Sequence, residues 1–224
     1  MAIEMVASDL EGTMTAGQAW RGMRDYLSAY GHGTAYKRFW RQQLPGYLLM
    51  KMGLRPLQPY KEQWITGMLR LFAGFSEAQF AEMAEWVVVR EMWPQRRKRV
   101  LAELEAHGEN GRTVIIVSGM AQPILDNFAA RLGIEGQGTP LVFEDGRFTG
   151  ELAAPLNVRE HKAVWLQNRL DDGLLAAAYG DTAGDIPMLH MSQEAVAVWP
   201  DKTLRAEAEA NGWRILEGVV KNKD

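Results

Sequence analysis

Apolar residues recur with a helical period in one region of this chain and gather into short runs elsewhere. Within residues 16–90 the apolar positions lie three or four apart, as in Trp20, Met23 and Leu27. This spacing predicts a series of amphipathic helices. A short apolar run such as Thr113 to Val117 instead predicts a buried strand.

From Arg96 onward, predicted helices and strands alternate. Strands are predicted at Ile3 to Ala7, Thr113 to Val117, Leu174 to Tyr179 and Ala195 to Val198, with a hairpin at Pro140 to Gly150 around Asp145-Gly146. Two of the helices are expected to have N-caps, at Asn157 and Asp201. Alternation of this kind is typical of an α/β fold, in which helices cover both faces of a parallel sheet.

The helical region lies between the first two predicted strands. Ser76 followed by Gln79 predicts a capping box, whereas Pro45-Gly46 interrupts the pattern and predicts a break between helices. The apolar stretch Tyr47 to Leu54 is expected to pack in the core of this region. We therefore expect two parts, which are an α/β core formed by residues 1–15 and 93–224 and a compact all-helical insert formed by residues 16–92.

Composition narrows the class of protein. The chain has 224 residues, 47% of them hydrophobic, which is enough for a substantial core. A net charge of −3 does not favour nucleic-acid binding, and a chain without cysteine has neither disulfides nor thiolate metal sites. No apolar run is long enough for a membrane span, and the first predicted strand leaves no room for a signal peptide. We expect a cytoplasmic protein without stable membrane insertion, whose oligomeric state the sequence leaves open.

Polar side chains follow the predicted strands, at the points where the strands end. Asp9 and Glu11 follow the first strand, and Ser118 follows the second. Asp181 follows a later strand, with Asp185 four residues further on. Because the carboxyl ends of parallel strands meet at one edge of a sheet, we expect these side chains to converge.

Lys162, near the start of the helix before Asp181, completes a set that suits phosphoryl transfer. Asp9 is the expected nucleophile, and Glu11 is the expected general acid and base. Carboxylates gathered in one place repel one another unless a cation lies between them, and Mg²⁺ prefers oxygen ligands. The expected metal ligands are Asp9, Glu11 (through its backbone carbonyl), Asp181 and Asp185. The expected phosphate-binding groups are Thr13, Ser118, Gly119 (through its amide at a helix N-terminus) and Lys162.

Four segments resemble the four sequence motifs of the haloacid dehalogenase superfamily of phosphatases. They are Asp9-Leu10-Glu11-Gly12-Thr13, Val117-Ser118-Gly119, Lys162, and Gly180 to Leu189. The helical segment directly after the first motif resembles the cap of the phosphoserine-phosphatase-like branch. The resemblance implies a Rossmann-like core, magnesium, and an aspartyl-phosphate intermediate on Asp9.

Three departures from the family pattern bear on the metal and the substrate. Glu11 stands where most members have a second aspartate, and Gly184 stands where many have asparagine. Residues 15–20 contain no acid, although phosphoserine phosphatases have a glutamate here that holds the substrate amine. The sequence therefore predicts a magnesium-dependent phosphomonoesterase for a small organic phosphate, disfavours phosphoserine, and leaves the actual substrate open.

Other interpretations fit some of the same residues. A phosphotransferase or mutase would use the same core, and a catalytically silent binding module would retain only the fold. The aromatic and methionine residues of the cap indicate core packing, or alternatively a lid over a substrate with an apolar body. The basic run Arg96 to Arg99 is typical of a solvated helix start.

Overall fold

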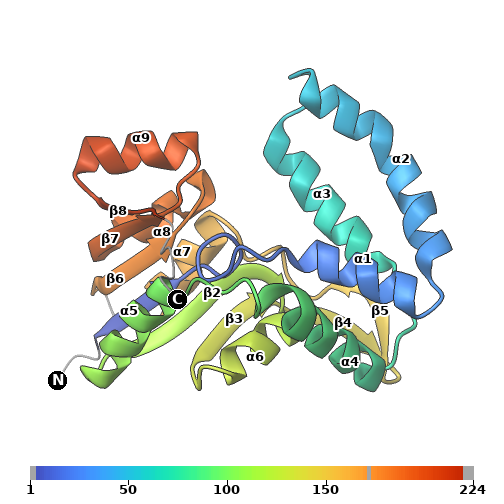
Figure 1. The fold of residues 1–224 in the computed structure, drawn as a ribbon, viewed down its shortest axis with the longest axis horizontal. Helices are drawn as coiled ribbons and strands as arrows, with labels where there is room; N and C mark the ends of the chain where they lie inside the picture. The colour runs from blue at the N-terminus through green and yellow to red at the C-terminus, as the bar shows by residue number, and fades with distance from the viewer. Residues whose placement is uncertain (1–3, 171–172, 219–224) are drawn as a thin grey trace, which may run out of the picture.

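Six parallel strands form the central sheet of the computed structural model, which describes residues 4–170 and 173–218 (Figure 1). Their order across the sheet is β3-β2-β1-β6-β7-β8. Their bounds are β1 Met5–Ser8, β2 Thr113–Ala121, β3 Glu135–Thr139, β6 Leu175–Gly180, β7 Ser192–Val198 and β8 Arg214–Leu216. A separate antiparallel hairpin pairs β4 (Leu141–Glu144) with β5 (Arg147–Leu152). The predicted parallel α/β architecture is confirmed.

Helices cover both faces of the sheet, and the alternation of side chains along β1 shows how. Met5 and Ala7 point into one apolar layer and Val6 into the other. The first layer packs against α7 (Glu160–Gln167), α8 (Ile186–His190) and α9 (Lys202–Asn211), with a 3₁₀ turn (Ala183–Asp185) leading into α8. The second packs against α5 (Lys98–Glu109) and α6 (Gln122–Ala130). A strand that is buried on both faces consists of a nearly continuous run of apolar residues, and β1 is such a strand.

β1 lies at the point where the order of strands reverses. Ser8 is paired with Ile116 of β2 on one side and with Tyr179 of β6 on the other. Because the chain leaves β1 toward β2 and returns much later to β6, the loops at their carboxyl ends diverge and open a crevice. Asp9 is the first residue beyond β1 and lies at this crevice.

Between β1 and β2 the chain forms a helical insertion. Its elements are α1 (Ala19–Ala29), α2 (Gly33–Lys51), α3 (Leu57–Arg70), α4 (Glu77–Val87) and a π-helical turn (Val88–Met92). Side chains of α1, α4 and the π-helical turn belong to the same apolar cluster as one face of the sheet. α2 contributes Phe39 and α3 contributes Met68 and Leu69 to this cluster, while the rest of the two helices projects from the molecule as an antiparallel pair (Figure 1). Within residues 4–170 and 173–218, no helix has both the length and the apolarity to cross a bilayer.

Two expectations about the insertion are wrong. α2 continues through Pro45, so the single hydrogen bond that proline removes does not end the helix here. Gly46 instead allows α2 to approach α3 closely, because a Cβ at this position would lie 3.3 Å from the Tyr60 ring. The stretch Tyr47 to Leu54 does not pack as a core segment, since Leu48, Met52 and Leu54 are 52%, 63% and 71% exposed.

Local expectations elsewhere have mixed outcomes. The capping box at Ser76 is confirmed, as is the N-cap at Asp201. Asn157 is not an N-cap, because α7 begins only at Glu160 and the Asn157 side chain donates to the Gln137 carbonyl. β3 and β8 were not expected from the sequence, and Ile3 lies outside the described residues.

Candidate active site

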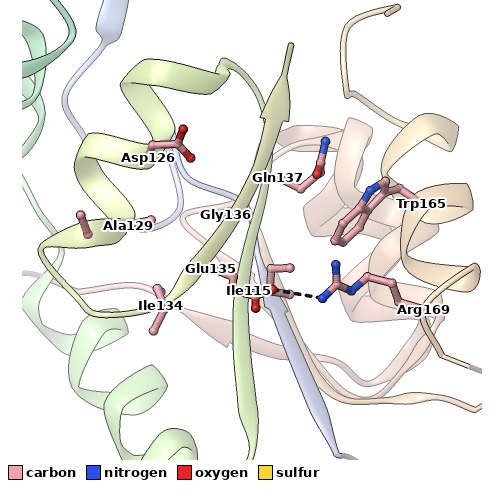
Figure 2. Close-up of a pocket in the computed structure, with 10 residues that line it drawn as sticks. Ile115, Asp126, Ala129, Ile134, Glu135, Gly136, Gln137, Trp165 and Arg169 are labelled. Carbon is pink, nitrogen blue, oxygen red and sulfur yellow. Dashed lines mark hydrogen bonds and ion pairs between the residues drawn. The ribbon is translucent and has the colours of Figure 1, made fainter. Parts of the chain in front are cut away.

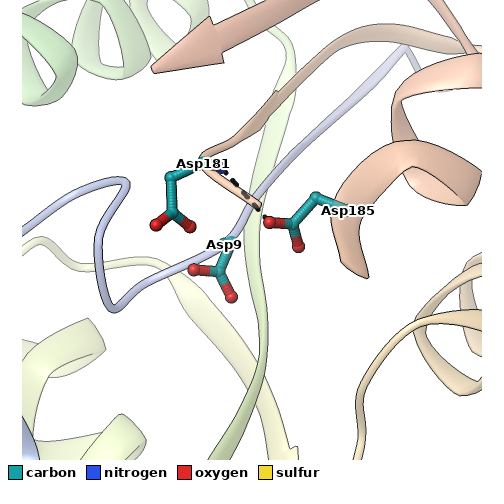
Figure 3. Close-up of side chains that lie close together, drawn as sticks. All are labelled: Asp9, Asp181 and Asp185. Atoms are coloured by element: carbon teal, nitrogen blue, oxygen red, sulfur yellow. Dashed lines mark hydrogen bonds between the residues drawn. The ribbon is translucent and has the colours of Figure 1, made fainter. Parts of the chain in front are cut away.

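Three aspartates lie together beyond the carboxyl ends of β1 and β6 (Figure 3). One carboxylate oxygen from each of Asp9, Asp181 and Asp185 lies within 4.8 Å of the other two. Asp9 and Asp185 are buried, and Asp181 is partly buried. The pairing of β1 with β6 brings the two loops together, and the Asp9 amide donates to the Tyr179 carbonyl at 2.9 Å.

Lys162 connects two of these aspartates. Its Nζ lies 2.5 Å from Asp9 Oδ1 and 2.6 Å from Asp185 Oδ1, and its side chain is 4% exposed. Burial by itself would lower the pKa of Lys162, but the Asp185 and Asp9 carboxylates outweigh that effect and raise the pKa above its ordinary value. Lys162 therefore stays charged and fixes the orientation of the Asp9 carboxylate.

The second oxygen of Asp185 holds the loop after β6. Oδ2 accepts hydrogen bonds from the Asp181 and Thr182 amides at 3.2 and 3.1 Å, and from the Thr182 hydroxyl at 3.2 Å. Both Asp185 oxygens thus have protein partners. This carboxylate is positioned by the loop it belongs to.

The loop after β1 depends on a glycine. Gly12 has φ +97°, and a Cβ there would lie only 1.9 Å from Asp181 Oδ2. Glycine is required because the conformation is unfavourable for other residues and the carboxylate occupies the space. The next residue, Thr13, is buried, and its hydroxyl lies 3.3 Å from Asp181 Oδ1 and 3.5 Å from Asp9 Oδ2.

Burial makes this cluster electrostatically unfavourable. Burial, together with the charges of Asp9 and Asp185, raises the pKa of Asp181 to about 8. Burial also raises the pKa of Asp9, with a further contribution from Asp185 that opposes the lowering by Lys162. Three carboxylates face one ammonium group, so negative charge is in excess.

Glu11 lies outside the three-aspartate cluster. Its Oε2 accepts from the Ala19 amide at 2.9 Å, at the first residue of α1. Burial raises the pKa of Glu11 to about 7. A carboxyl group with this pKa exchanges its proton readily near neutral pH.

Ser118 and Gly119 lie at the carboxyl end of β2, next to the Asp9 loop in the sheet. Ser118 is buried, but within the described residues its side chain donates no hydrogen bond to the acidic cluster. β2 continues to Ala121 and α6 begins at Gln122, so the Gly119 amide is not at a helix N-terminus as expected. A Cβ at Gly119 would lie 2.5 Å from Val158, which shows how closely β2 approaches the segment before α7.

Arg97 is a residue of this region that sequence reasoning missed. Its Nε donates to the Gly12 carbonyl at 3.0 Å, and its guanidinium lies 4.0 Å from the centre of the Trp199 ring. Arg97 therefore supports the loop that carries Gly12, contrary to the solvated helix start expected for the run Arg96 to Arg99. Its partners lie far away in the sequence, so the basic run alone contains no signal of this role.

The amino-acid sequence also matches a known protein family. The model of the haloacid dehalogenase-like hydrolase family matches residues 6–190. The chain belongs to the haloacid dehalogenase-like hydrolase family. A match of this length includes the Asp9 loop, Lys162 and both later aspartates.

Two curated proteins and one solved structure show what this chain is similar to. It is 28% identical over 155 residues to a probable phosphatase of Mycobacterium tuberculosis, covering 67% of this chain and 54% of that protein. The chain thus spans about half the length of that curated relative. It is 28% identical over 193 residues to a histidinol-phosphatase of Neisseria meningitidis serogroup C, covering 80% of each chain. A phosphoserine phosphatase structure with a phospho-aspartyl intermediate analogue shares the fold, with a TM-score of 0.63 and 16% identity over 97% of this chain and 95% of that one.

The donor set of the acidic cluster fits a hard divalent cation. The three aspartates offer oxygen ligands within bridging distance of one another, as Mg²⁺ requires. Their excess negative charge gives a physical reason for a cation to bind there.

Two pockets lie outside the acidic cluster, and neither is lined by a predicted site residue. One, of about 610 Å³, lies between α3 and the start of α7, where Glu62, Thr66 and Arg70 line it together with Arg159 and His161. The other, of about 400 Å³, lies beside β3 between α6 and α7 (Figure 2). A 3.0 Å ion pair between Arg169 and Glu135 borders the second pocket. The first pocket adjoins the helix that carries Lys162.

Proposed function

We propose that this chain is a magnesium-dependent phosphomonoesterase that hydrolyses a small organic phosphate through an aspartyl-phosphate on Asp9. The observation that carries the proposal is the contact of Lys162 with Asp9 and Asp185, inside a buried cluster that Asp181 completes. Membership of the haloacid dehalogenase-like hydrolases and the phosphatase names of two relatives support the same reaction.

In the first step, a carboxylate oxygen of Asp9 attacks the phosphorus atom and the ester P–O bond breaks. The leaving alcohol oxygen takes the proton of Glu11. Lys162 holds Asp9 in place and offsets the repulsion between the carboxylate and the phosphate dianion. Thr13, Ser118 and Gly119 are the proposed ligands of the non-bridging phosphate oxygens.

In the second step, Glu11, now ionised, accepts a proton from water, and the water oxygen attacks phosphorus. The bond between phosphorus and Asp9 breaks, which releases inorganic phosphate and restores the carboxylate. A pKa of about 7 suits both roles, because Glu11 must give up a proton in one step and take one in the next.

Asp9, Asp181 and Asp185, with the Glu11 backbone carbonyl, are the proposed ligands of Mg²⁺. When bound, the ion neutralises phosphate charge and orients the phosphoryl group for in-line attack. Asp185 is already oriented by the loop amides and by Lys162. A cation would also favour the ionised form of Asp181, whose pKa is raised to about 8.

The proposed substrate region lies between the helical insertion and the core. We assign residues 16–92 the role of a cap over a core formed by residues 1–15 and 93–224. The pocket between α3 and α7 has charged and amide groups from both parts, among them Glu62, Gln63 and Arg159. The aromatic residues instead contact one another, as Trp64 does with Trp20 and Phe39. These contacts favour a polar leaving group over one with a large apolar body.

Hydrolysis of an aryl phosphate, with and without Mg²⁺, tests the reaction. Asp9→Asn should lower kcat by at least about 10⁴-fold, because the nucleophile is lost, while circular dichroism and Tm show a folded protein. Glu11→Gln should slow turnover and allow phosphorylated Asp9 to accumulate, which mass spectrometry of acid-quenched protein detects. Full turnover by Asp9→Asn, or the same rate in EDTA as in Mg²⁺, contradicts the proposal.

A panel of phosphorylated metabolites then defines the substrate. Histidinol phosphate and phosphoserine belong in the panel because relatives or structural neighbours bear those names. Transfer to an added alcohol, measured against phosphate release, separates hydrolysis from phosphotransfer.

A further inference from the structure

Charge is unevenly distributed along the chain. Residues 26–61 contain six of its 25 Lys and Arg residues and none of its 28 Asp and Glu residues. This acid-free stretch includes all of α2 and the turn into α3. This stretch therefore carries a net positive charge that no acidic residue within it offsets, although the chain as a whole is acidic.

The same helices expose large apolar side chains. One stripe of exposed apolar side chains runs along α2 at intervals of four residues. It consists of Trp40, Leu44, Leu48 and the C-cap residue Met52. They are 39%, 40%, 52% and 63% exposed. Leu49 and Leu54 extend the apolar surface at the tip, and we call these six side chains the arm surface.

Cations lie among the apolar side chains of the arm surface. Lys37, Arg41 and Lys51 are exposed on α2, and Lys51 lies 5.8 Å from the Tyr47 ring. Within residues 4–170 and 173–218 none of the three forms an ion pair with a carboxylate. Their charges are thus available to an external partner.

We propose that the arm surface docks on an anionic lipid bilayer. A helix with exposed Trp, Leu and Met side chains among Lys and Arg inserts its apolar groups at the headgroup boundary, while the long cationic side chains reach the lipid phosphates. The absence of acidic residues over the stretch 26–61 removes the repulsion that a negative membrane surface would otherwise exert. The inference goes beyond the proposed reaction and does not rest on it.

Charge also favours an anionic lipid bilayer over a second copy of the chain as the partner of the arm surface. Pairing two arm surfaces about a two-fold axis would place Lys37, Arg41 and Lys51 of one copy near the same cations of the other. Like charges at such a contact oppose association. An anionic lipid surface instead complements both the apolar and the cationic groups.

Vesicle co-sedimentation of the full chain tests the proposal. The chain should bind vesicles of phosphatidylcholine mixed with phosphatidylglycerol, bind vesicles of phosphatidylcholine alone far more weakly, and dissociate as salt is added. Leu48→Gln should weaken binding about tenfold, because one exposed leucine no longer enters the lipid. Arg41→Gln should weaken it about fivefold, because one cation is lost near the surface.

Matched variants elsewhere serve as controls. Leu174→Gln alters a leucine that is 58% exposed, and Lys202→Gln removes an exposed cation at the start of α9. Both should bind vesicles as the unmodified chain does, and all four variants should keep its activity on a water-soluble aryl phosphate. Equal loss of binding in the controls overturns the assignment to the arm surface.

Three other results would overturn the proposal. One is no binding to either kind of vesicle, and another is equal binding to both. The third is concentration-dependent dimerisation that Leu48→Gln abolishes, which would make a second copy the occupant.

Discussion

The carboxyl edge of the sheet and the α2–α3 pair depart from ordinary burial in opposite directions. At the sheet edge, Asp9, Asp185 and Lys162 are charged groups removed from water. On α2, leucines and a methionine are left in water, and Phe39 is the buried residue of the helix. Charges are ordinarily exposed and large apolar groups buried, so both regions depart from what stability alone favours. Such departures mark the places where a chain serves function.

The two regions differ in whether their unusually placed side chains have partners within the protein. The buried charges have specific partners within the protein, at 2.5 and 2.6 Å from Lys162. The exposed apolar groups of α2 have no comparable internal partner among the described residues. Substitutions should therefore be costly at the first region and nearly neutral for folding at the second.

The largest effect on stability is expected from Lys162→Met. This change leaves Asp9 and Asp185 facing each other without their shared cation, so the free energy of unfolding should fall by about 3–5 kcal/mol. Urea unfolding measures the change, and Lys202→Met, at an exposed position, should leave stability unchanged. A Lys162→Met protein as stable as the unmodified chain would show that the buried pair contributes nothing to folding.

An intermediate effect on stability is expected from Asp181→Asn, which should raise the free energy of unfolding where Lys162→Met lowers it. The pKa of Asp181 rises from 3.8 to about 8 on folding, so the folded protein binds more protons than the unfolded one between these values. Stability of the metal-free protein should therefore fall as pH rises through this window. Asp181→Asn should remove that dependence and raise the stability of the metal-free protein at pH 8.

Mg²⁺ supplies the control for Asp181→Asn. Added Mg²⁺ should raise the Tm of the unmodified chain by binding the folded state, and should raise that of Asp181→Asn much less. A lower Tm for metal-free Asp181→Asn would show that this carboxylate stabilises the fold.

The smallest effect is expected from Leu48→Gln. Because Leu48 is 52% exposed, its replacement should change the free energy of unfolding by less than about 0.5 kcal/mol. Met68→Ala, on the neighbouring helix but 1% exposed, should lower it by about 2–5 kcal/mol. Similar losses from the two changes would mean that α2 packs against other parts of the chain in solution.

The sequence predicted best those elements whose signal is local. β1 and β6 are continuous apolar runs, and Asp145-Gly146 forms the expected hairpin turn with φ +48° and +70°. The convergence of Asp9, Asp181 and Asp185 followed from strand ends, because parallel strands share an edge, and Lys162 joined them from the start of the preceding helix. Their proposed roles in catalysis and metal binding stay predictions.

The features that the sequence did not reveal depend on distant partners. β3 contains Gly136 and Gly138 and no large apolar residue, and a Cβ at Gly136 would lie 1.9 Å from Leu125 Cδ2. Its strand conformation is thus set by α6 and β2. The exposure of Leu48 was missed for a related reason, since apolar spacing is the same for a helix packed in a core and for one that projects from it.

The position of β1 in the middle of the sheet has a consequence for synthesis on the ribosome. Its two neighbours in the sheet begin at Thr113 and Leu175, so β1 leaves the ribosome long before either neighbour is made. At roughly 5–20 residues per second, β1 waits about 5–20 s for its first neighbour and longer for its second. During that interval the helical insertion is available to shield β1, and the acidic cluster is complete only once Asp181 and Asp185 have followed β6.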